Sequence, residues 1–136
     1  MAAIDKSPLH KESLSNVFIG ATVAARSPVT KGTLDVIVLR ALAWGPMHGF
    51  EIVEWIDRTT DQSLDLTDAA VYQALYRMER RKLLSAEWGT TENNRRARYY
   101  RLTAAGSAHL SEETQRWVHY ADTVTGLLTA PLKPRR

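Results

Sequence analysis

The segment from Leu66 to Leu102 constrains the fold most, because its apolar residues change from a helical to a strand period. One helix face is marked by Val71, Ala74, Leu75 and Met78. After Lys82 every second residue is apolar, at Leu84, Ala86 and Trp88 and again at Tyr100 and Leu102. The segment therefore predicts one helix followed by a two-stranded hairpin.

The predicted helix has a start signal and a second face of a different character. Thr67 is a candidate N-cap, with Leu66 and Val71 placed to form a hydrophobic staple. The face opposite the apolar one carries Gln73, Tyr76, Arg77 and Arg80. We expect the helix to bury one side and to present a polar, cationic side to its surroundings.

The connection between the two predicted strands is polar and ends in arginines. It runs from Gly89 to Arg96 and contains Asn93 and Asn94, residue types that tolerate turn conformations. Arg95 and Arg96 follow directly. A cationic helix beside a hairpin with an arginine tip is typical of a winged helix-turn-helix, in which the helix enters the major groove and the tip contacts the backbone or minor groove.

The net charge of +3 is distributed unevenly along the 136 residues. Residues 67 to 101 hold eight Arg or Lys against four Asp or Glu, whereas residues 48 to 66 hold one against five. A local basic surplus favours one face for a polyanion. The alternative interpretation is an ordinary solvated surface, and the coincidence of the surplus with the helix and hairpin pattern argues against it.

Several classes of site are disfavoured by the composition. Cysteine is absent, which excludes disulfides and thiolate metal sites and is compatible with a cytoplasmic protein. Histidines occur only at His10, His48, His109 and His119, without metal-ligand spacing. No glycine-rich phosphate loop or catalytic constellation has a spacing signal, and no apolar run is long enough to span a bilayer. We expect neither an enzyme, nor a metal, cofactor or membrane segment.

Two further helices are predicted before the central segment. Lys31 to Trp44 forms the first, with Thr33 as a plausible cap and an apolar face of Leu34, Ile37, Val38, Ala41 and Leu42. The sequence GPMHG then makes a turn, in which Met47 and His48 are turn and capping residues. Phe50 to about Thr59 forms the second helix, which is expected to bury Phe50, Val53 and either Ile52 or Ile56.

A last helix begins at Thr103 and carries a heptad-like seam. The seam consists of Leu110, Thr114, Trp117, Ala121, Val124 and Leu128. Its expected partner is a second copy of the chain in a twofold dimer. The alternative is that this helix folds back on the first helix, with Trp117 packed near Leu34 and Val38.

These elements predict a mainly α (α+β) fold, a winged helix-turn-helix with a C-terminal dimerisation helix. Residues 1–30 form an N-terminal extension, partly disordered, with an ordered segment near Val17 to Ala25 that is too short and interrupted for a signal peptide. Residues 31–102 form the DNA-binding domain, residues 103–130 the dimerisation helix and residues 131–136 a basic tail.

The chain from Lys31 to about Leu128 resembles the PadR family of bacterial transcriptional regulators. The resemblance rests on KGTLDVIVLRAL, GPMHGFEI, VYQALYRMER and EWGTTENNRRARYYRLTAAG taken together. It implies a winged helix-turn-helix, a dimerising C-terminal helix of the short branch, and mostly repression, in some members released by small aromatic or hydrophobic compounds. It also implies that Tyr72 contacts the DNA backbone, that Arg95 and Arg96 form the wing tip, and that Tyr100 and Leu102 pack on the core.

The resulting functional prediction is a dimeric, sequence-specific regulator of transcription that binds an inverted repeat in double-stranded DNA. The DNA-binding residues would be Tyr72, Gln73, Tyr76, Arg77, Arg80, Asn94, Arg95 and Arg96. A small aromatic effector would occupy a slot near Trp117 and Ala121, bordered by Leu34 and Val38. The alternative function is a protein-interaction module that keeps the fold without reading DNA.

Overall fold

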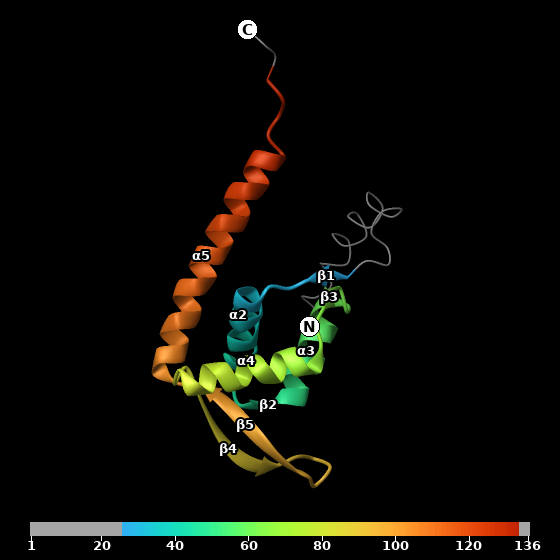
Figure 1. Cartoon of the computed structure of the whole chain (residues 1–136), viewed down its shortest axis with the longest axis vertical. Coiled ribbons are helices and arrows are strands. Elements are labelled where there is room, and N and C mark those ends of the chain that lie inside the picture. The colour runs from blue at the N-terminus through green and yellow to red at the C-terminus, as the bar shows by residue number, and fades with distance from the viewer. Residues whose placement is uncertain (1–25, 134–136) are drawn as a thin grey trace.

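The computed structural model describes residues 26–133 as three packed helices, a hairpin and one long helix that leaves them (Figure 1). In this range the helices are α2 (Lys31–Leu42), α3 (Gly49–Thr60), α4 (Asp68–Arg80) and α5 (Ala104–Leu128). The strands are β1 (Ser27–Pro28), β2 (Met47–His48), β3 (Leu64–Asp65), β4 (Leu84–Thr90) and β5 (Arg96–Leu102). The predicted α+β winged helix-turn-helix fold is confirmed.

One apolar core joins the three packed helices to the base of the hairpin. It contains Leu34, Val38, Leu39, Ala41 and Leu42 of α2, Ile52 and Ile56 of α3, Val71, Ala74, Leu75 and Met78 of α4, and Leu83, Leu84 and Tyr100. The predicted apolar face of α4 is thus buried as a whole. Burial of Phe50 was wrong, because this side chain lies two residues, or about 200° of helix rotation, from the inward-facing Ile52.

The helix ends are fixed by side-chain caps. Thr67 Oγ1 accepts the backbone N–H of Ala70 at 3.1 Å, as predicted for the start of α4. His48 caps α3 in a capping box, in which its Nδ1 accepts from the Glu51 backbone and Glu51 Oε1 accepts from the His48 backbone. The predicted Thr33 cap was wrong. Thr30 caps α2 instead and accepts the N–H of Thr33, because the helix already begins at Lys31.

The hairpin, called the wing below, is antiparallel and has a regular register. Leu84 lies opposite Leu102 and Thr90 lies opposite Arg96, so the connecting turn is shorter than the predicted Gly89 to Arg96. Met47 and His48 add a short third strand next to β5. Since alternate residues share a face, Trp88 and Arg98 lie on the same face of the wing as the buried Leu84 and Tyr100.

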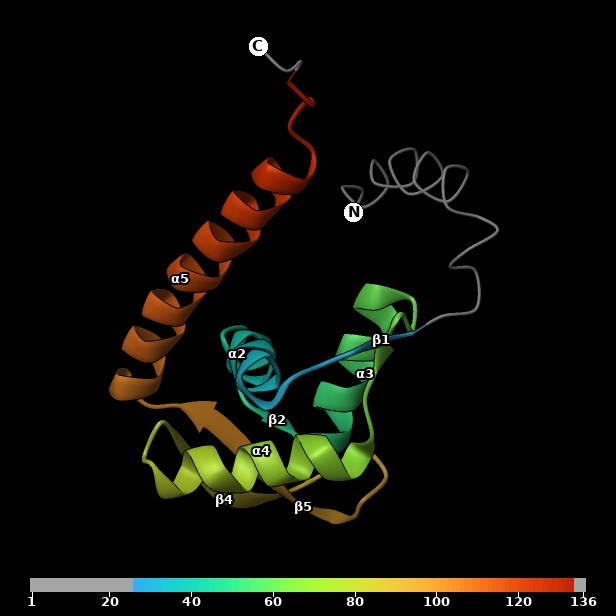
Figure 2. The same ribbon diagram turned by 45° about the horizontal axis from the view of Figure 1, so that its top comes forward.

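The long helix α5 starts against the base of the wing and then extends past the other helices, as both views show (Figures 1 and 2). Thr103 caps it, and Gly106 permits the close approach of its first turn, because an added Cβ would collide with the carbonyl oxygen of Leu83. Farther along, Trp117, Leu127 and Leu128 are exposed. Most of α5 therefore has no partner within the described part of the chain that would cover its apolar side chains.

The segment before α2 is attached to the loop that precedes α4. Ser27–Pro28 pairs in parallel with Leu64–Asp65. Arg26 donates from Nε to the carbonyl of Gln62 and from Nη2 to that of Leu64, both at 2.8 Å. The predicted ordered segment from Val17 to Ala25 and the end of the predicted basic tail lie outside the described residues.

Candidate nucleic-acid interface

The exposed face of α4 carries the predicted polar and aromatic residues together. Tyr72, Gln73, Tyr76 and Arg77 line one shallow hollow of about 420 Å³ on the helix surface. Arg80 is exposed one turn beyond, with its guanidinium 5.6 Å from the centre of the Tyr76 ring. The exposed face of α4 thus offers aromatic rings, an amide and cations, which are groups that read base edges and phosphates.

Arg77 differs from the other residues of this face because it has a partner inside the protein. Its Nη2 lies 2.5 Å from Asp35 Oδ1 of α2, and both side chains are mostly shielded from solvent. This ion pair joins α2 to α4 through two residues that are 42 positions apart in the sequence. Arg77 therefore fixes the position of α4 on α2 while its remaining surface borders the hollow.

Replacing Asp35 by alanine should lower the free energy of unfolding by about 1–3 kcal/mol, because a hydrogen bond to a charged group is lost and Arg77 is left partly buried without its partner. The measurement is the urea midpoint of the full chain. Glu113→Ala is the matched control, since it removes the exposed Arg116–Glu113 pair on α5 and should change the free energy by less than about 0.5 kcal/mol. Equal losses of unfolding free energy in the two variants would contradict the role of Arg77 in fixing α4 on α2.

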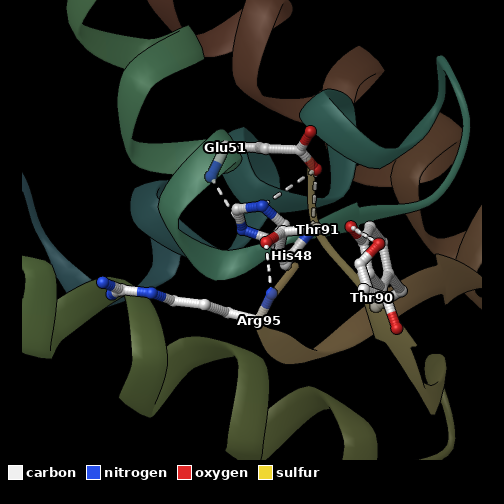
Figure 3. Close-up of polar contacts among 6 residues, drawn as sticks. His48, Glu51, Thr90, Thr91 and Arg95 are labelled. Atoms are coloured by element: carbon white, nitrogen blue, oxygen red, sulfur yellow. Dashed lines mark hydrogen bonds and ion pairs between the residues drawn. The ribbon is translucent and has the colours of Figure 1, made fainter. Parts of the chain in front are cut away.

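The wing tip is a tight turn that leaves its arginines at the surface. Thr91 donates its backbone N–H to Arg95 O at 2.8 Å, and Thr91 Oγ1 accepts the Arg95 N–H at 3.2 Å. Asn94 adopts the left-handed conformation, with φ 63°, as suits an asparagine in a turn. Figure 3 shows this turn beside His48 and Glu51, with the Arg95 side chain extending away from both.

The second tip arginine is stacked on a tryptophan. The Arg96 guanidinium lies 4.5 Å from the centre of the Trp88 ring, and Trp88 itself is 58% exposed. Arg98 lies directly opposite Trp88 in the register, and its guanidinium lies 5.9 Å from the centre of the same ring. Stacking on an indole restricts a long, flexible arginine, so Trp88 holds Arg96 at the tip.

An ion pair connects the wing to α4. Arg98 donates from Nη1 and Nη2 to both carboxylate oxygens of Glu79, at 3.2 and 2.8 Å. Sequence reasoning did not single out Trp88, Arg98 or Glu79 as parts of the site. The alternating pattern was a usable signal, because it already placed Trp88 on the face of the wing that carries Leu84 and Ala86.

The wing tip and the starts of α3 and α4 enclose a groove of about 770 Å³. Its lining brings the predicted Tyr72, Arg95 and Arg96 together with His48, Phe50 and Tyr99. Glu51 and Glu54 of α3 and Glu92 of the wing turn also line it, whereas its two arginines both come from the wing. Gln73, Tyr76 and Arg80 belong to the adjoining face of α4 and not to this groove.

Tyr72 stands at the border of the groove and the α4 hollow, since it lines both. Burial raises the pKa of its phenol above the ordinary value of 10.0, and the nearby carboxylate of Asp68 raises it further. The hydroxyl therefore stays protonated at neutral pH. A protonated phenol is a hydrogen-bond donor of the kind that contacts DNA phosphates.

The predicted seam of α5 is only partly covered within one chain. Leu110 packs against the core, and Ala121 and Val124 are half-buried. Thr114 and Trp117 are exposed, and Leu128 is 80% exposed. Of the residues assigned to an effector slot, Leu34 and Val38 lie buried in the core, whereas Trp117 keeps 48% of its surface exposed.

Other kinds of site find no support in residues 26–133. No group of three or more His, Asp or Glu residues in this range could hold a metal ion. In the same range no helix combines the length and apolar character needed to cross a membrane.

Comparison with known proteins gives a consistent result. The profile described as "Transcriptional regulator PadR-like family" matches residues 38–112, from the middle of α2 into α5. An uncharacterised protein of Lysinibacillus sphaericus is 30% identical over 99 residues, which cover 73% of this chain and 91% of that protein. The profile match includes the wing and all of α4.

Solved structures have a similar fold. A PadR family transcription regulator from Clostridium difficile is 25% identical, with a TM-score of 0.60 over 70% of this chain and 97% of that one. A PadR-like transcriptional regulator from Bacillus cereus is 24% identical, with a TM-score of 0.65 over 74% of this chain and 96% of that one. The latter likeness is one of fold alone.

Proposed function

We propose that this chain, which belongs to the PadR-like family of transcriptional regulators, acts as a homodimeric repressor that binds an inverted-repeat operator. Members of this family are regulators of transcription and not enzymes. For this chain we propose, beyond the family's role, which residues bind DNA, that the chain forms a dimer and acts as a repressor, that an effector releases it, and that it is located in the cytoplasm. Repression is the mode that the family resemblance favours.

The observation that carries the proposal is the continuity of the α4 face with the wing tip. Gln73 and Tyr76 are the proposed base readers, and Arg80 is a cation on the same exposed face. Tyr72 borders the groove whose other side is formed by Arg95 and Arg96. If α4 lay in the major groove, the wing arginines would lie next to the flanking DNA backbone. Asn94, which directly precedes them in the wing turn, would lie there as well.

The proposed dimer uses the apolar residues that α5 leaves exposed. Trp117, Val124 and Leu128 lie within one broad stripe of the helix, and Leu110, Thr114 and Ala121 complete it. Large exposed apolar side chains in a row favour association with a matching surface. A twofold dimer would present two copies of α4 to half-sites about one helical turn, roughly 34 to 36 Å, apart.

Selection of random duplexes by the full chain, followed by sequencing, tests the proposal. The expected result is an enriched inverted repeat with one helical turn between the centres of its halves. The alternative function, a protein-interaction module that keeps the fold, predicts tight self-association with no enriched sequence and no saturable binding to any duplex. Such a result would overturn DNA readout and favour the alternative.

We further propose that a small aromatic or hydrophobic compound releases the operator by binding across the dimer axis. Two symmetry-related Trp117 indoles, with the small Ala121 one turn away, would border a flat apolar slot. Leu34 and Val38, the other residues that would border the slot, are buried in the core of the single chain. Release requires that the compound bind the dimer conformation that cannot bind DNA more tightly than the conformation that can. For ordinary coupling the difference is about 1–3 kcal/mol.

Replacing Trp117 by leucine should raise the concentration of planar or phenolic compounds needed for release by about tenfold or more, because ring stacking is lost from both subunits. The measurement is operator binding during titration, followed in parallel with tryptophan fluorescence. Trp44→Leu is the matched control, because Trp44 is exposed just beyond the end of α2 and does not belong to the stripe. Release of both variants at the concentrations that release the unmodified protein would contradict the slot.

A further inference from the structure

We propose that Gly49 is a positioning residue for Tyr72, because the missing side chain at the first position of α3 leaves the space in which the Tyr72 ring lies. The two residues come from different helices, and their contact lies at the groove between α4 and the wing. The inference rests on the proposed function, since it concerns how Tyr72 is presented to the DNA backbone.

The contact leaves no room for a larger residue at position 49. A Cβ built on Gly49 would lie 2.5 Å from Tyr72 Cζ and 2.8 Å from its Oη, and it would also collide with Cε1. Carbon atoms that are not bonded pack at about 3.5–4.0 Å. Alanine at position 49 would therefore force the far end of the Tyr72 side chain to move.

The backbone itself does not require glycine here. Among the described residues the glycine with a positive φ is Gly45, whereas Gly49 is an ordinary helical residue that follows the His48 cap. Alanine has a higher helix propensity than glycine. Tyr72 is 46% exposed and is free to swing outward. Gly49→Ala should therefore keep the fold and change the place of one ring.

The position of the Tyr72 ring should affect the affinity for DNA. Tyr72 lines both the groove and the α4 hollow, so its position determines where the phenol meets a strand of DNA. A side chain that is already held in its bound position does not have to be ordered when the complex forms. A displaced Tyr72 would lose its contact with the DNA backbone.

A double-mutant cycle in the full chain tests this inference against the duplex obtained by selection. Gly49→Ala and Tyr72→Ala should each weaken binding by about tenfold, the size expected for one hydrogen bond to a charged group. The double variant should bind like Tyr72→Ala alone, because the two changes act on the same contact. Unchanged affinity of Gly49→Ala, or losses that multiply in the double variant, would overturn the inference.

Gly32→Ala is the matched control. Gly32 also lies in the first turn of a helix, and an added Cβ there would meet no atom within 4 Å. Its affinity for the duplex should be unchanged. Urea unfolding of every variant checks the fold, and any loss of stability in Gly49→Ala should be recovered when Tyr72 is also replaced, since the clash is then absent.

Fluorine NMR with fluorotyrosine in place of tyrosine follows the ring without DNA, and Tyr72→Phe assigns its resonance. Gly49→Ala should shift the Tyr72 signal and should leave that of Tyr120, which lies on α5, in place. An unshifted Tyr72 signal would overturn this inference but would leave the proposed function untouched. Absence of saturable duplex binding by the unmodified protein would instead overturn the proposed function, and with it the role of the seated ring in binding.

Discussion

Replacing Val124 and Leu128 together by glutamate should convert the protein from dimers into monomers. Leu128 is 80% exposed in the single chain, so its replacement costs the monomer little. In the proposed interface the same two carboxylates would be buried without partners, which costs several kcal/mol per charge. The measurement is the mass in solution by sedimentation or light scattering, across a range of protein concentrations.

Loss of the dimer should also weaken operator binding by about 10²-fold or more, because the second half-site no longer binds as part of the same molecule. Gln115→Glu with Thr123→Glu is the matched control, since both residues lie on α5 away from the stripe and add the same charge. That control should remain dimeric. An intact dimer after the Val124 and Leu128 changes would move the interface elsewhere.

Replacing Arg95 and Arg96 together by alanine should weaken operator binding and reduce its dependence on salt. Each phosphate contact that is lost should flatten the slope of log K against log salt concentration by about 0.9, because fewer counterions are released on binding. The binding isotherms are measured at several salt concentrations. The single variants separate the two residues, since Arg96 is stacked on Trp88 whereas Arg95 extends from the turn.

Arg101→Ala is the matched control for the wing variant. Arg101 lies on β5, faces the opposite side of the wing from Arg98, and pairs with Glu87 at 3.6 Å. Its replacement removes one positive charge, as each single replacement of Arg95 or Arg96 does, without touching the tip, so the slope should stay close to that of the unmodified protein. An unchanged slope in the Arg95 and Arg96 variant would remove the wing from the site.

The elements that sequence reasoning predicted well are those whose burial has a clear period. The apolar residues of α4 repeat every three or four positions, and all of them are buried. The residues of the wing strands alternate, and the apolar positions Leu84, Ala86 and Trp88 lie on one face as predicted. Thr67 could be predicted as a cap because a single threonine preceded a run of helix-forming residues.

The predictions that failed concern features that a period does not specify. Thr30 and Thr33 are both plausible caps, and the choice depends on where the chain turns, which is set by the pairing of Ser27–Pro28 with β3. Phe50 is apolar but lies on the side of the first turn of α3 that faces away from the core, whereas Ile52 in the same turn faces inward. Hydrophobicity alone does not distinguish it from Ile52.

Contacts between distant residues were also beyond the sequence. Arg77 was assigned to DNA by its helix face, and only the fold reveals Asp35 next to it. The stack of Arg96 on Trp88 and the seating of Tyr72 over Gly49 likewise depend on how two elements meet. These contacts position the residues that sequence reasoning selected.

The most direct test of DNA recognition by α4 and the wing is a titration of the full chain into the selected duplex and into a scrambled duplex of equal length, followed by fluorescence anisotropy at several salt concentrations. We expect saturable binding of two chains per selected duplex, tighter by about 10³-fold or more than binding to the scrambled duplex, with an affinity that falls steeply as salt rises. Equal binding to both duplexes, or no saturation with either, would contradict it.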